Sequence, residues 1–481
     1  MAYIVLINPR IGIYSTVFKP FIPLSLLAAA APAAQAGHTI EIIDQAVDRH
    51  WETSLRDRLS TRNPAFIGIT SMTGAQLKGA LKAAAITREY PGIPVVFGGV
   101  HASLFPEGTL MHPHVDYVVV GEGETALMEL LGFLTTGVPL PVDIPSLGWK
   151  DADGAATINP RGPFHNMNAL PDTPYDLIDI HPYLHTYFWE KNVIDMETSR
   201  GCPYNCGFCY NEIYNQRTWR AMEPEKIVRT MESLVLRTGV TNFLFIDDSF
   251  FIDSKRVMRM VDMLEQQPFR VKMGFQGRIN SVAKLSDSEL ERLLAVGAVF
   301  FQFGVESGSP RILKLINKCL DVDEVLAMNQ RMRQYESVST FYNFMVGLPT
   351  ETRDDVMATV DLAWRLLEEN PRAYLGTIHL YKEYPGTPLY RMALESGYTP
   401  PRTLEEWANY DWQSVVLRSH DQALSKLCRA VSAASYCVDR KIEMLGDSRI
   451  AGWISDLYRP IARFRFKHKF FRWMPEARIF G

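Results

Sequence analysis

The densest group of reactive side chains in this 481-residue chain lies in one short segment, SRGCPYNCGFCYN (199–211). The segment contains Cys202, Cys206 and Cys209, which are half of the six cysteines in the sequence. Because three and then two residues separate them, one loop is able to present three thiolates to a single inorganic centre. Thiolates bind both zinc and iron-sulfur clusters, so the spacing predicts a metal or cluster site.

The number of cysteines separates these two kinds of site. A structural zinc ion takes four tetrahedral protein ligands. The nearest other cysteine is Cys319, and no histidine lies between His185 and His379. An iron-sulfur cube held by three thiolates instead leaves its fourth iron open to a substrate or cofactor. We therefore interpret the segment as a 4Fe-4S site, with structural zinc or an inert thiol cluster as the minor alternative.

Strand-like apolar runs alternate with helical stretches up to residue 138. This alternation predicts βαβ units and a parallel sheet, in which ligands bind beyond the carboxyl ends of the strands. The segments at those ends are therefore the next candidates for a binding site. They read SMTGAQ (71–76), GGVHAS (98–103) and GEGET (121–125), and the strand-like runs cover 3–8, 39–44, 66–70, 94–99 and 116–121.

The segment GEGETA also fits the G-x-G-x-x-A pattern of dinucleotide sites. It follows the fifth strand-like run rather than the first, and Glu122 and Glu124 have the wrong charge for a pyrophosphate. We therefore set the dinucleotide interpretation aside.

A second alternation of strands and helices follows a proline-rich linker. The linker covers 139–190 and contains a hairpin turn, DADG, at 151–154. Six strand-helix units then predict a partial (β/α) barrel with its active site at the carboxyl ends of the strands. The cysteine segment directly follows the first strand. The six strand-like runs cover 193–199, 242–248, 271–278, 299–307, 340–349 and 375–385.

Composition narrows the class of protein. A net charge of −4 with 47% hydrophobic residues gives no electrostatic case for a nucleic-acid partner and favours small-molecule chemistry. Six cysteines are too sparse for a disulfide framework, which favours the reducing cytoplasm. The apolar run 24–37 lacks a basic start, so we expect a buried helix and not a signal peptide. No apolar run reaches the length of about 18 residues that a membrane span needs.

The region after residue 390 lacks strand signals and is expected to be mainly helical. It ends in the basic and aromatic segment RPIARFRFKHKFFRWMPEAR (459–478). We interpret this tail as a solvated helix or strand that caps the barrel. Contact with a membrane surface or an anionic substrate is the alternative.

In this setting the three cysteines, with Phe208 just before the last one, resemble the radical S-adenosylmethionine (SAM) enzymes. The resemblance covers about residues 193–390. It implies a 4Fe-4S cluster whose open iron chelates SAM, and an electron donor such as flavodoxin or ferredoxin. Reduction would then yield a 5′-deoxyadenosyl radical that removes hydrogen from an unactivated position.

The same resemblance implies SAM-binding roles for residues at successive strand ends. Asp247 and Asp248 would bind the methionyl amino group, although the glycines of the family's Gly-Gly-Glu pattern are absent here. The guanidinium fork of Arg278 suits the methionyl carboxylate. Further positions in the SAM site would be Phe208, Glu306 at the ribose hydroxyls, Gly347 near the adenine, and His379 on the last strand.

The first domain resembles the cobalamin-binding domain of cobalamin-dependent radical SAM enzymes through GITSMTG, GGVHAS and VVVGEGE. The Asp-x-His-x-x-Gly pattern of histidine-ligated cobalt is missing, so the lower face of cobalt would rest against the loop 71–76, nearest Met72 and Thr73. His101 would touch the corrin or its tail, or else be structural. The residues implied in cobalamin binding are Ser71, Met72, Thr73, Gly74, Gln76, Gly98, Gly99, His101, Glu122, Gly123 and Glu124.

Together these observations predict an α/β chain with three cofactors: a 4Fe-4S cluster, SAM and cobalamin. We expect a Rossmann-like cobalamin-binding domain at 1–138, a linker with a small hairpin at 139–190, a partial (β/α)6 TIM-type radical SAM barrel at 191–390 and a helical region at 391–481. The expected activity is methylation of an unactivated carbon or phosphorus. The alternatives are ring formation or rearrangement on a tetrapyrrole-like or natural-product substrate, and a non-enzymatic cobalamin sensor.

Overall fold

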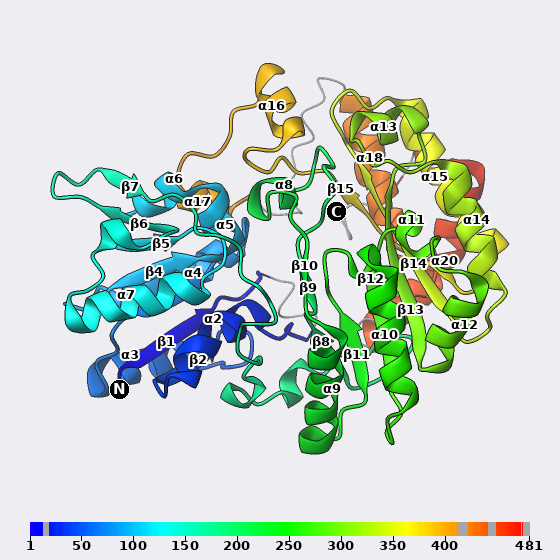
Figure 1. Ribbon diagram of the computed structural model, residues 1–481. Coiled ribbons are helices and arrows are strands. Elements are labelled where there is room, and N and C mark those ends of the chain that lie inside the picture. The colour runs from blue at the N-terminus through cyan, green and yellow to red at the C-terminus, as the bar shows by residue number, and fades with distance from the viewer. Residues whose placement is uncertain (13–18, 411–421, 441–448, 473, 475–481) are drawn as a thin grey trace. The chain divides into compact units, whose positions relative to one another are not determined.

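The computed structural model describes residues 1–12, 19–410, 422–440, 449–472 and 474, except for the side chains of 449–452 and 454. Contacts divide the chain into two compact units. Unit 1 comprises 1–183, 213–215 and 399–414, and unit 2 comprises the remainder. In Figure 1 the strands of unit 1 run from blue to cyan, and those of unit 2 from green to yellow.

Unit 1 is built on a seven-stranded sheet with the order β2-β1-β3-β4-β5-β6-β7. The first five strands in this order are parallel, as the sequence predicted. The switch in strand order lies between β1 and β3, where ligands of such sheets usually bind. The strands are β1 (Tyr3–Asn8), β2 (Thr39–Asp44), β3 (Ile67–Thr70), β4 (Val95–Gly98), β5 (Tyr117–Val119), β6 (Leu147–Lys150) and β7 (Ala156–Ile158).

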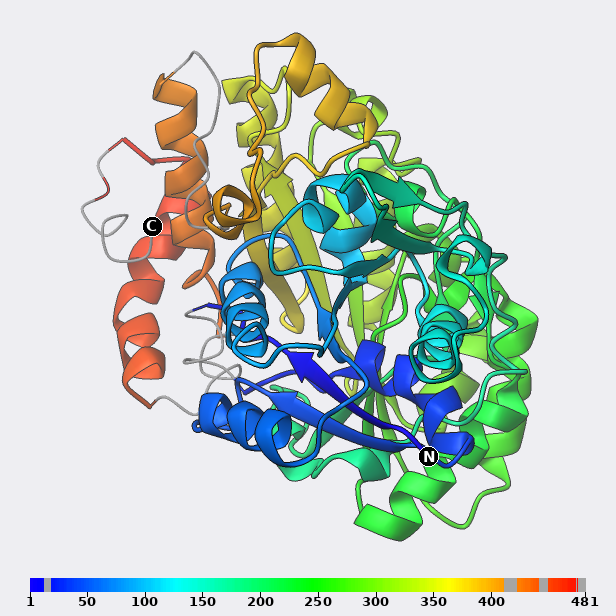
Figure 2. The same cartoon turned by 90° about the vertical axis from the view of Figure 1, so that its left-hand side faces the viewer.

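Helices cover both faces of this sheet, which explains why β1 is apolar at four consecutive positions. Ile4 and Leu6 pack in one core with α2 (Leu24–Gln35) and α7 (Glu124–Thr136). Val5 and Ile7 pack in a second core with α3 (Trp51–Thr61) and α4 (Gln76–Thr87). Short helices α5 (Gly99–Leu104) and α6 (Pro106–Leu110) follow β4, and Figure 2 shows the same elements with the left-hand side of Figure 1 facing the viewer.

Two segments that the sequence placed elsewhere belong to unit 1. The expected linker contributes β6 and β7, which extend the sheet because β6 pairs antiparallel with the free edge of β5. Such pairing satisfies backbone groups that an open edge would expose. The second segment contains α17 (Leu404–Ala408), which packs on α4 and buries Trp407 completely.

Unit 2 is built on six parallel strands in the order β15-β14-β13-β12-β11-β8, the arrangement expected of a partial barrel. A two-stranded ribbon, β9 (Ser199–Arg200) with β10 (Arg220–Ala221), flanks the cysteine segment. The barrel strands are β8 (Val193–Met196), β11 (Asn242–Phe245), β12 (Lys272–Gly277), β13 (Ala298–Glu306), β14 (Ser339–Val346) and β15 (Ala373–Leu380).

Amphipathic helices return the chain between these strands. Several begin at a capping side chain: Asp253 accepts hydrogen bonds from two backbone N–H groups of α10, and Ser286 and Thr352 form capping boxes at α12 and α15. The helices are α8 (Asn211–Tyr214), α9 (Pro224–Thr238), α10 (Ser254–Glu265), α11 (Ile279–Val282), α12 (Asp287–Ala295), α13 (Pro310–Leu315), α14 (Val322–Arg333), α15 (Arg353–Glu369) and α16 (Pro388–Glu395).

The C-terminal part of the described chain is helical, as expected, and consists of α18 (Gln422–Ser435) and α20 (Arg449–His468). The edge strand β15 is protected by this region: the N–H groups of Ile378 and Leu375 donate to the Ser435 hydroxyl at 2.9 Å and the Asp439 carboxylate at 2.7 Å. Among the described helices, none is long and apolar enough to cross a bilayer.

Candidate functional site

The cysteine segment forms a loop that two backbone hydrogen bonds fix to the rest of unit 2. Gly207 N–H donates to the Ile316 carbonyl at 2.8 Å, and the Gly207 carbonyl accepts from Leu389 N–H at 3.0 Å. A further turn joins Cys209 N–H to the Cys206 carbonyl at 3.0 Å. The backbone of the loop is therefore fixed. Cys206 is buried, whereas Cys202 and Cys209 are partly exposed.

Arg278 lies beside this loop, at the carboxyl end of β12. Its guanidinium donates to the Cys206 sulfur at 3.3 Å, stacks 3.9 Å from the centre of the Tyr204 ring, and also donates to the Lys318 carbonyl. The cation is thus buried next to the thiols, and its charge favours the ionised form of Cys202. The sequence placed Arg278 at the methionyl carboxylate, and the structure brings it to the cysteines themselves.

Burial opposes the ionisation of two of the three thiols, Cys202 and Cys209. Burial raises the pKa of Cys202, while the nearby Arg278 acts in the opposite direction. Burial also raises the pKa of Cys209, to about 12. Such thiols retain their protons until a metal displaces them.

Among the described residues, this loop included, no three His, Cys, Asp or Glu side chains are grouped to hold a single metal ion. A cubane makes a different demand, because each thiolate binds a separate iron and the sulfurs need not converge on one point. Three thiols on one anchored loop beside a guanidinium fit such a cluster. The three cysteine ligands stay a prediction.

The two adjacent carboxylates after β11 have different surroundings. Asp247 is buried and accepts hydrogen bonds from Thr198 N–H at 2.7 Å, the Thr198 hydroxyl at 2.6 Å and the Ser199 hydroxyl at 2.6 Å. Asp248 retains exposed surface, accepts from Gly201 N–H at 2.9 Å and is hydrogen-bonded to the Asn211 side chain. Asp247 therefore fixes the strand that enters the cysteine loop, which leaves Asp248 as the carboxylate able to face a ligand.

Glu306, at the end of β13, forms a buried ion pair with Lys318. The Lys318 ammonium lies 2.8 Å from the Glu306 carboxylate and 5.9 Å from the centre of the Phe208 ring. Glu306 has a left-handed φ of 77°, unusual for a residue with a side chain. A side chain at Gly304 would overlap the carboxylate. Backbone strain at a strand end is typical of functional sites.

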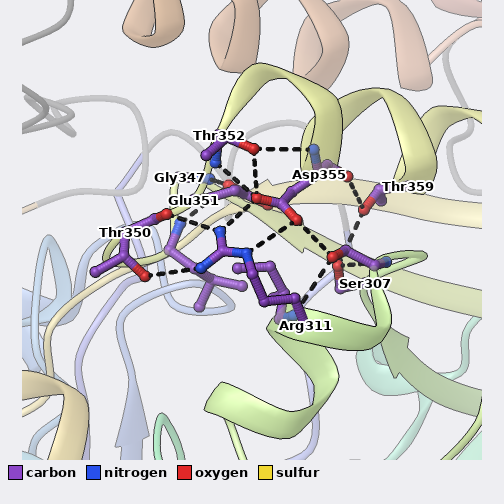
Figure 3. Close-up of polar contacts among 11 residues, drawn as sticks. Ser307, Arg311, Gly347, Thr350, Glu351, Thr352, Asp355 and Thr359 are labelled. Atoms are coloured by element: carbon purple, nitrogen blue, oxygen red, sulfur yellow. Dashed lines mark hydrogen bonds and ion pairs between the residues drawn. The ribbon is translucent and has the colours of Figure 1, made fainter.

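Gly347, at the end of β14, is held by a polar network around Glu351 and Asp355 (Figure 3). One Glu351 oxygen accepts from Gly347 N–H and from Leu348 N–H at 3.2 Å. Asp355 accepts from the Thr352 hydroxyl at 2.6 Å and the Ser309 hydroxyl at 2.5 Å, and pairs with Arg311. Because Ser309 follows β13, this network fixes the loops after β13 and β14 relative to each other.

A cavity of about 710 Å³ adjoins Gly347 and Glu351 in unit 2, with Tyr398, Cys428 and Arg429 also in its lining. This volume is in the range of small-molecule sites. The two remaining residues of the expected SAM site differ in environment. Phe208 packs against the apolar cluster of Ile312, Ile316 and Leu389, whereas His379 is exposed on β15.

In unit 1 the predicted cobalamin-binding segments lie together after β3, β4 and β5. A side chain added at Gly98 or Gly121 would meet nothing within 4 Å, so these strand ends leave open space. Gly99 has a φ of 88°, and an added Cβ would lie 2.8 Å from the Ser71 carbonyl. Met72 is 49% exposed at this edge. The open space at Gly98 and Gly121, the close backbone contact at Gly99 and the exposed thioether of Met72 are compatible with a large planar ligand at this edge.

His101 does not face this open space. It is completely buried, its Nδ1 lies 3.0 Å from the Thr73 hydroxyl, and its ring lies 5.7 Å from that of Trp407. Burial lowers the pKa of His101 to about 4, so the ring is neutral at physiological pH. The structure therefore gives His101 a role in holding Thr73, and through it the loop 71–76.

The rest of that loop is also fixed from within unit 1. The Gln76 side chain accepts from Met72 N–H at 2.6 Å and donates to the Pro9 carbonyl at 3.1 Å. The Ser71 hydroxyl donates to the Gly98 carbonyl at 2.8 Å. An added Cβ at Gly74 would lie 3.0 Å from the Tyr410 carbonyl, so this glycine permits close contact with the segment after α17.

Glu122 and Glu124, expected at the corrin amides, lie against another segment of unit 1. Glu122 accepts from His165 N–H at 3.0 Å, and the His165 ring lies 3.9 Å from Glu124. Gly123 directly precedes α7 and is its N-cap. A cavity of about 260 Å³ adjoins Glu122, with Gly121, Arg161 and His165 in its lining.

Sequence reasoning missed Lys318, Glu351 and Trp407. Glu351 follows Gly347 by four residues, a spacing that allows its carboxylate to turn back onto the Gly347 N–H. Lys318 and Trp407 lie in segments without strand or motif signals, so only tertiary contacts reveal their roles.

Comparison with known families gives two matches that together span most of the residues described above. The Radical SAM superfamily profile matches residues 196–363. The B12 binding domain profile matches residues 12–131. The first match contains the cysteine loop and the ends of β11 to β14, and the second contains the loops after β3, β4 and β5.

Individual relatives and one solved structure match large parts of this chain. An uncharacterized methyltransferase of Pyrococcus horikoshii is 26% identical over 85% of this chain and 87% of its own length. The anaerobic magnesium-protoporphyrin IX monomethyl ester cyclase of Rubrivivax gelatinosus is 25% identical over 71% of this chain, but the match spans only 62% of the cyclase. The solved radical SAM methyltransferase TsrM from Kitasatospora setae, with cobalamin and a [4Fe-4S] cluster bound, superposes over both full chains with a TM-score of 0.71 at 18% identity, which shows a shared fold.

Proposed function

Because the chain belongs to the cobalamin-dependent radical SAM enzymes, we propose that it methylates an unactivated carbon or phosphorus centre of a small molecule. The observation that carries the proposal is the presence of both domains in one chain together with a relative of nearly the same length that is named a methyltransferase. When bound, the cluster and SAM supply a hydrogen-abstracting adenosyl radical, and cobalamin supplies the methyl group.

The residues of unit 2 would hold SAM and the cluster at the carboxyl ends of the strands. Cys202, Cys206 and Cys209 would bind the cluster, and the buried Arg278 would offset the negative charge of the thiolates. The exposed Asp248 would accept hydrogen bonds from the methionyl ammonium. The Glu306 carboxylate, oriented by Lys318, would accept from the ribose hydroxyls, and Phe208, Gly347 and His379 would border the nucleoside.

The residues of unit 1 would position cobalamin without a histidine on cobalt. Met72 and Thr73 would lie at the lower face of the corrin, and His101 would fix Thr73 from behind. Gly98 and Gly99 would permit backbone approach, and Glu122 and Glu124 would accept hydrogen bonds from corrin amides. Electrons would come from a flavodoxin or ferredoxin in the reducing cytoplasm.

The second candidate function is ring formation or rearrangement, which the match to the magnesium-protoporphyrin ester cyclases supports. That match covers less of the relative's length than the match to the methyltransferase does. Methyl transfer is therefore the stronger proposal.

Isotope transfer separates these candidates. The enzyme, reconstituted anaerobically with iron, sulfide and cobalamin, is incubated with a reduced flavodoxin, with small molecules extracted from its host and with SAM that carries a deuterated methyl group. Methyl transfer predicts a product heavier by one labelled methyl group, absent with the Cys206→Ala variant. An unlabelled product formed together with 5′-deoxyadenosine would instead support ring chemistry.

A further inference from the structure

Helix α20 exposes an apolar stripe along one face. Trp453 and Leu457 are each 68% exposed, Ile461 is 49% exposed and Phe464 is 54% exposed. Separations of four, four and three residues place these side chains above one another on a helix. Isolated exposed hydrophobic residues are common, but a contiguous apolar stripe indicates an interaction surface.

The stripe is not the face by which α20 packs in its own unit. Ala462 and Phe466 are completely buried on the opposite face, and the helix contacts α15 and α18 (Figure 2, red beside orange). The stripe therefore faces away from the side on which α20 is anchored. This orientation leaves the helix available to a partner without loss of its packing.

Charge accompanies the stripe. Residues 449–472 contain seven Lys and Arg side chains and a single acid, Asp456, which makes a net charge of +6 (7 − 1). The whole chain has a net charge of −4, so the other residues together carry −10. Asp456 pairs with Arg459, Lys469 pairs with Asp361, and Arg465 is buried. Lys467 and Arg472 are exposed at the C-terminal end of the stripe. The surface is therefore both apolar and cationic.

We propose that α20 and the following segment to Arg472 bind the surface of an anionic phospholipid bilayer. Apolar side chains of such a helix enter the acyl boundary, tryptophan favours the interface, and Lys and Arg pair with phosphate groups. A second copy of the chain would bring the same positive charge and would be repelled. This binding goes beyond methyl transfer: it would deliver the enzyme to substrates dissolved in a membrane.

Vesicle flotation of the full-length protein tests this proposal without any assay of activity, so its failure is distinct from failure of methyl transfer. The protein should float with vesicles of phosphatidylglycerol and phosphatidylcholine, and much less with phosphatidylcholine alone or at high salt. Leu457→Ser and Phe464→Ser should each weaken binding about tenfold, since each removes one buried apolar side chain from the bilayer. Lys467→Glu should weaken it without altering the apolar stripe.

The matched control is Leu236→Ser, because Leu236 is 77% exposed on α9 and lies outside the stripe. This variant should float like the unaltered protein. Circular dichroism establishes that each variant is folded. The proposal is overturned if the protein does not float with anionic vesicles, or if Leu236→Ser weakens binding as much as Leu457→Ser. It is also overturned if the protein forms a concentration-dependent dimer that the stripe variants abolish.

Discussion

Three thiols and one guanidinium determine the chemistry available at the cysteine loop. We expect Cys206→Ala to lose most of the iron taken up in anaerobic reconstitution, because the variant lacks one of three proposed ligands and the acceptor of the Arg278 hydrogen bond. Iron and sulfide assays with the absorbance spectrum measure this loss. Cys319→Ala is the control, since Cys319 is exposed and outside the loop. Equal iron loss in both variants would contradict the proposed ligand set.

The Glu306–Lys318 pair shows how charge is arranged at a strand end. We expect Lys318→Met to lower the free energy of unfolding by roughly 3–5 kcal/mol, because a buried carboxylate would lose its partner. Glu306→Gln combined with Lys318→Met should recover part of this loss, since neither charge remains. Denaturant unfolding of Lys318→Met, Glu306→Gln and the double variant measures the coupling between the two side chains. A loss in the double variant equal to or larger than the sum of the two single losses would argue against a direct pair.

Glu351 makes stability depend on pH through its raised pKa. Burial raises the pKa to about 7 from 4.5, and the Gly347 and Leu348 N–H groups oppose this only in part. Its second oxygen is buried without a hydrogen-bond partner. Asp355 adds to the shift and Arg311 reduces it. The folded chain therefore keeps a proton that the unfolded chain releases as the pH rises through this window.

It follows that this group stabilises the fold fully below pH 4.5 and that its contribution falls as the pH rises to about 7. The loss amounts to at most about 3 kcal/mol, at 1.36 kcal/mol per pKa unit. Glu351→Gln should remove this slope while its amide oxygen still accepts from Gly347 N–H. Urea unfolding across the window compares the two proteins, and identical slopes would contradict the assignment.

At the level of elements, α17 supports the loop 71–76, which we propose to bind cobalamin, through Trp407. Because Trp407 packs on His101 and Phe105, Trp407→Ala should cost about 3–5 kcal/mol of stability and leave a cavity behind the loop. We expect several-fold weaker binding of hydroxocobalamin, measured by absorbance titration. Trp453→Ala is the matched control, since that tryptophan is 68% exposed in unit 2. Unchanged affinity in a folded Trp407→Ala protein would show that α17 does not contribute to cobalamin binding.

The whole molecule consists of two units with separate cores. Unit 1 has apolar cores on both faces of its sheet, and unit 2 has a core rich in phenylalanine that includes Phe245, Phe275 and Phe301. We expect calorimetry to resolve two unfolding transitions. Cobalamin at a concentration of about 100 times its Kd should stabilise only the unit 1 transition, by about 2.7 kcal/mol. Equal shifts in both transitions would show that the units unfold together.

The sequence by itself determined the two parallel sheets, the buried helix α2, and the loop that presents the three cysteines. Each of these features depends on local order: apolar runs fix strands, strand ends fix where loops emerge, and the cysteine spacing is contained in eight residues. The strands β1 and β2 have the bounds that their apolar runs predicted. Cofactor identity followed from the same local motifs.

Only the tertiary structure decided which side chains already have hydrogen-bond partners within the protein and which distant segments complete each unit. The neighbouring residues Asp247 and Asp248 look equivalent in sequence, yet three donors saturate one and leave the other exposed. Trp407 reaches His101 across some three hundred residues, and the hairpin of β6 and β7 joins a sheet edge instead of linking domains. Hydrogen-bond saturation and long-range packing depend on the whole fold, so no local pattern encodes them.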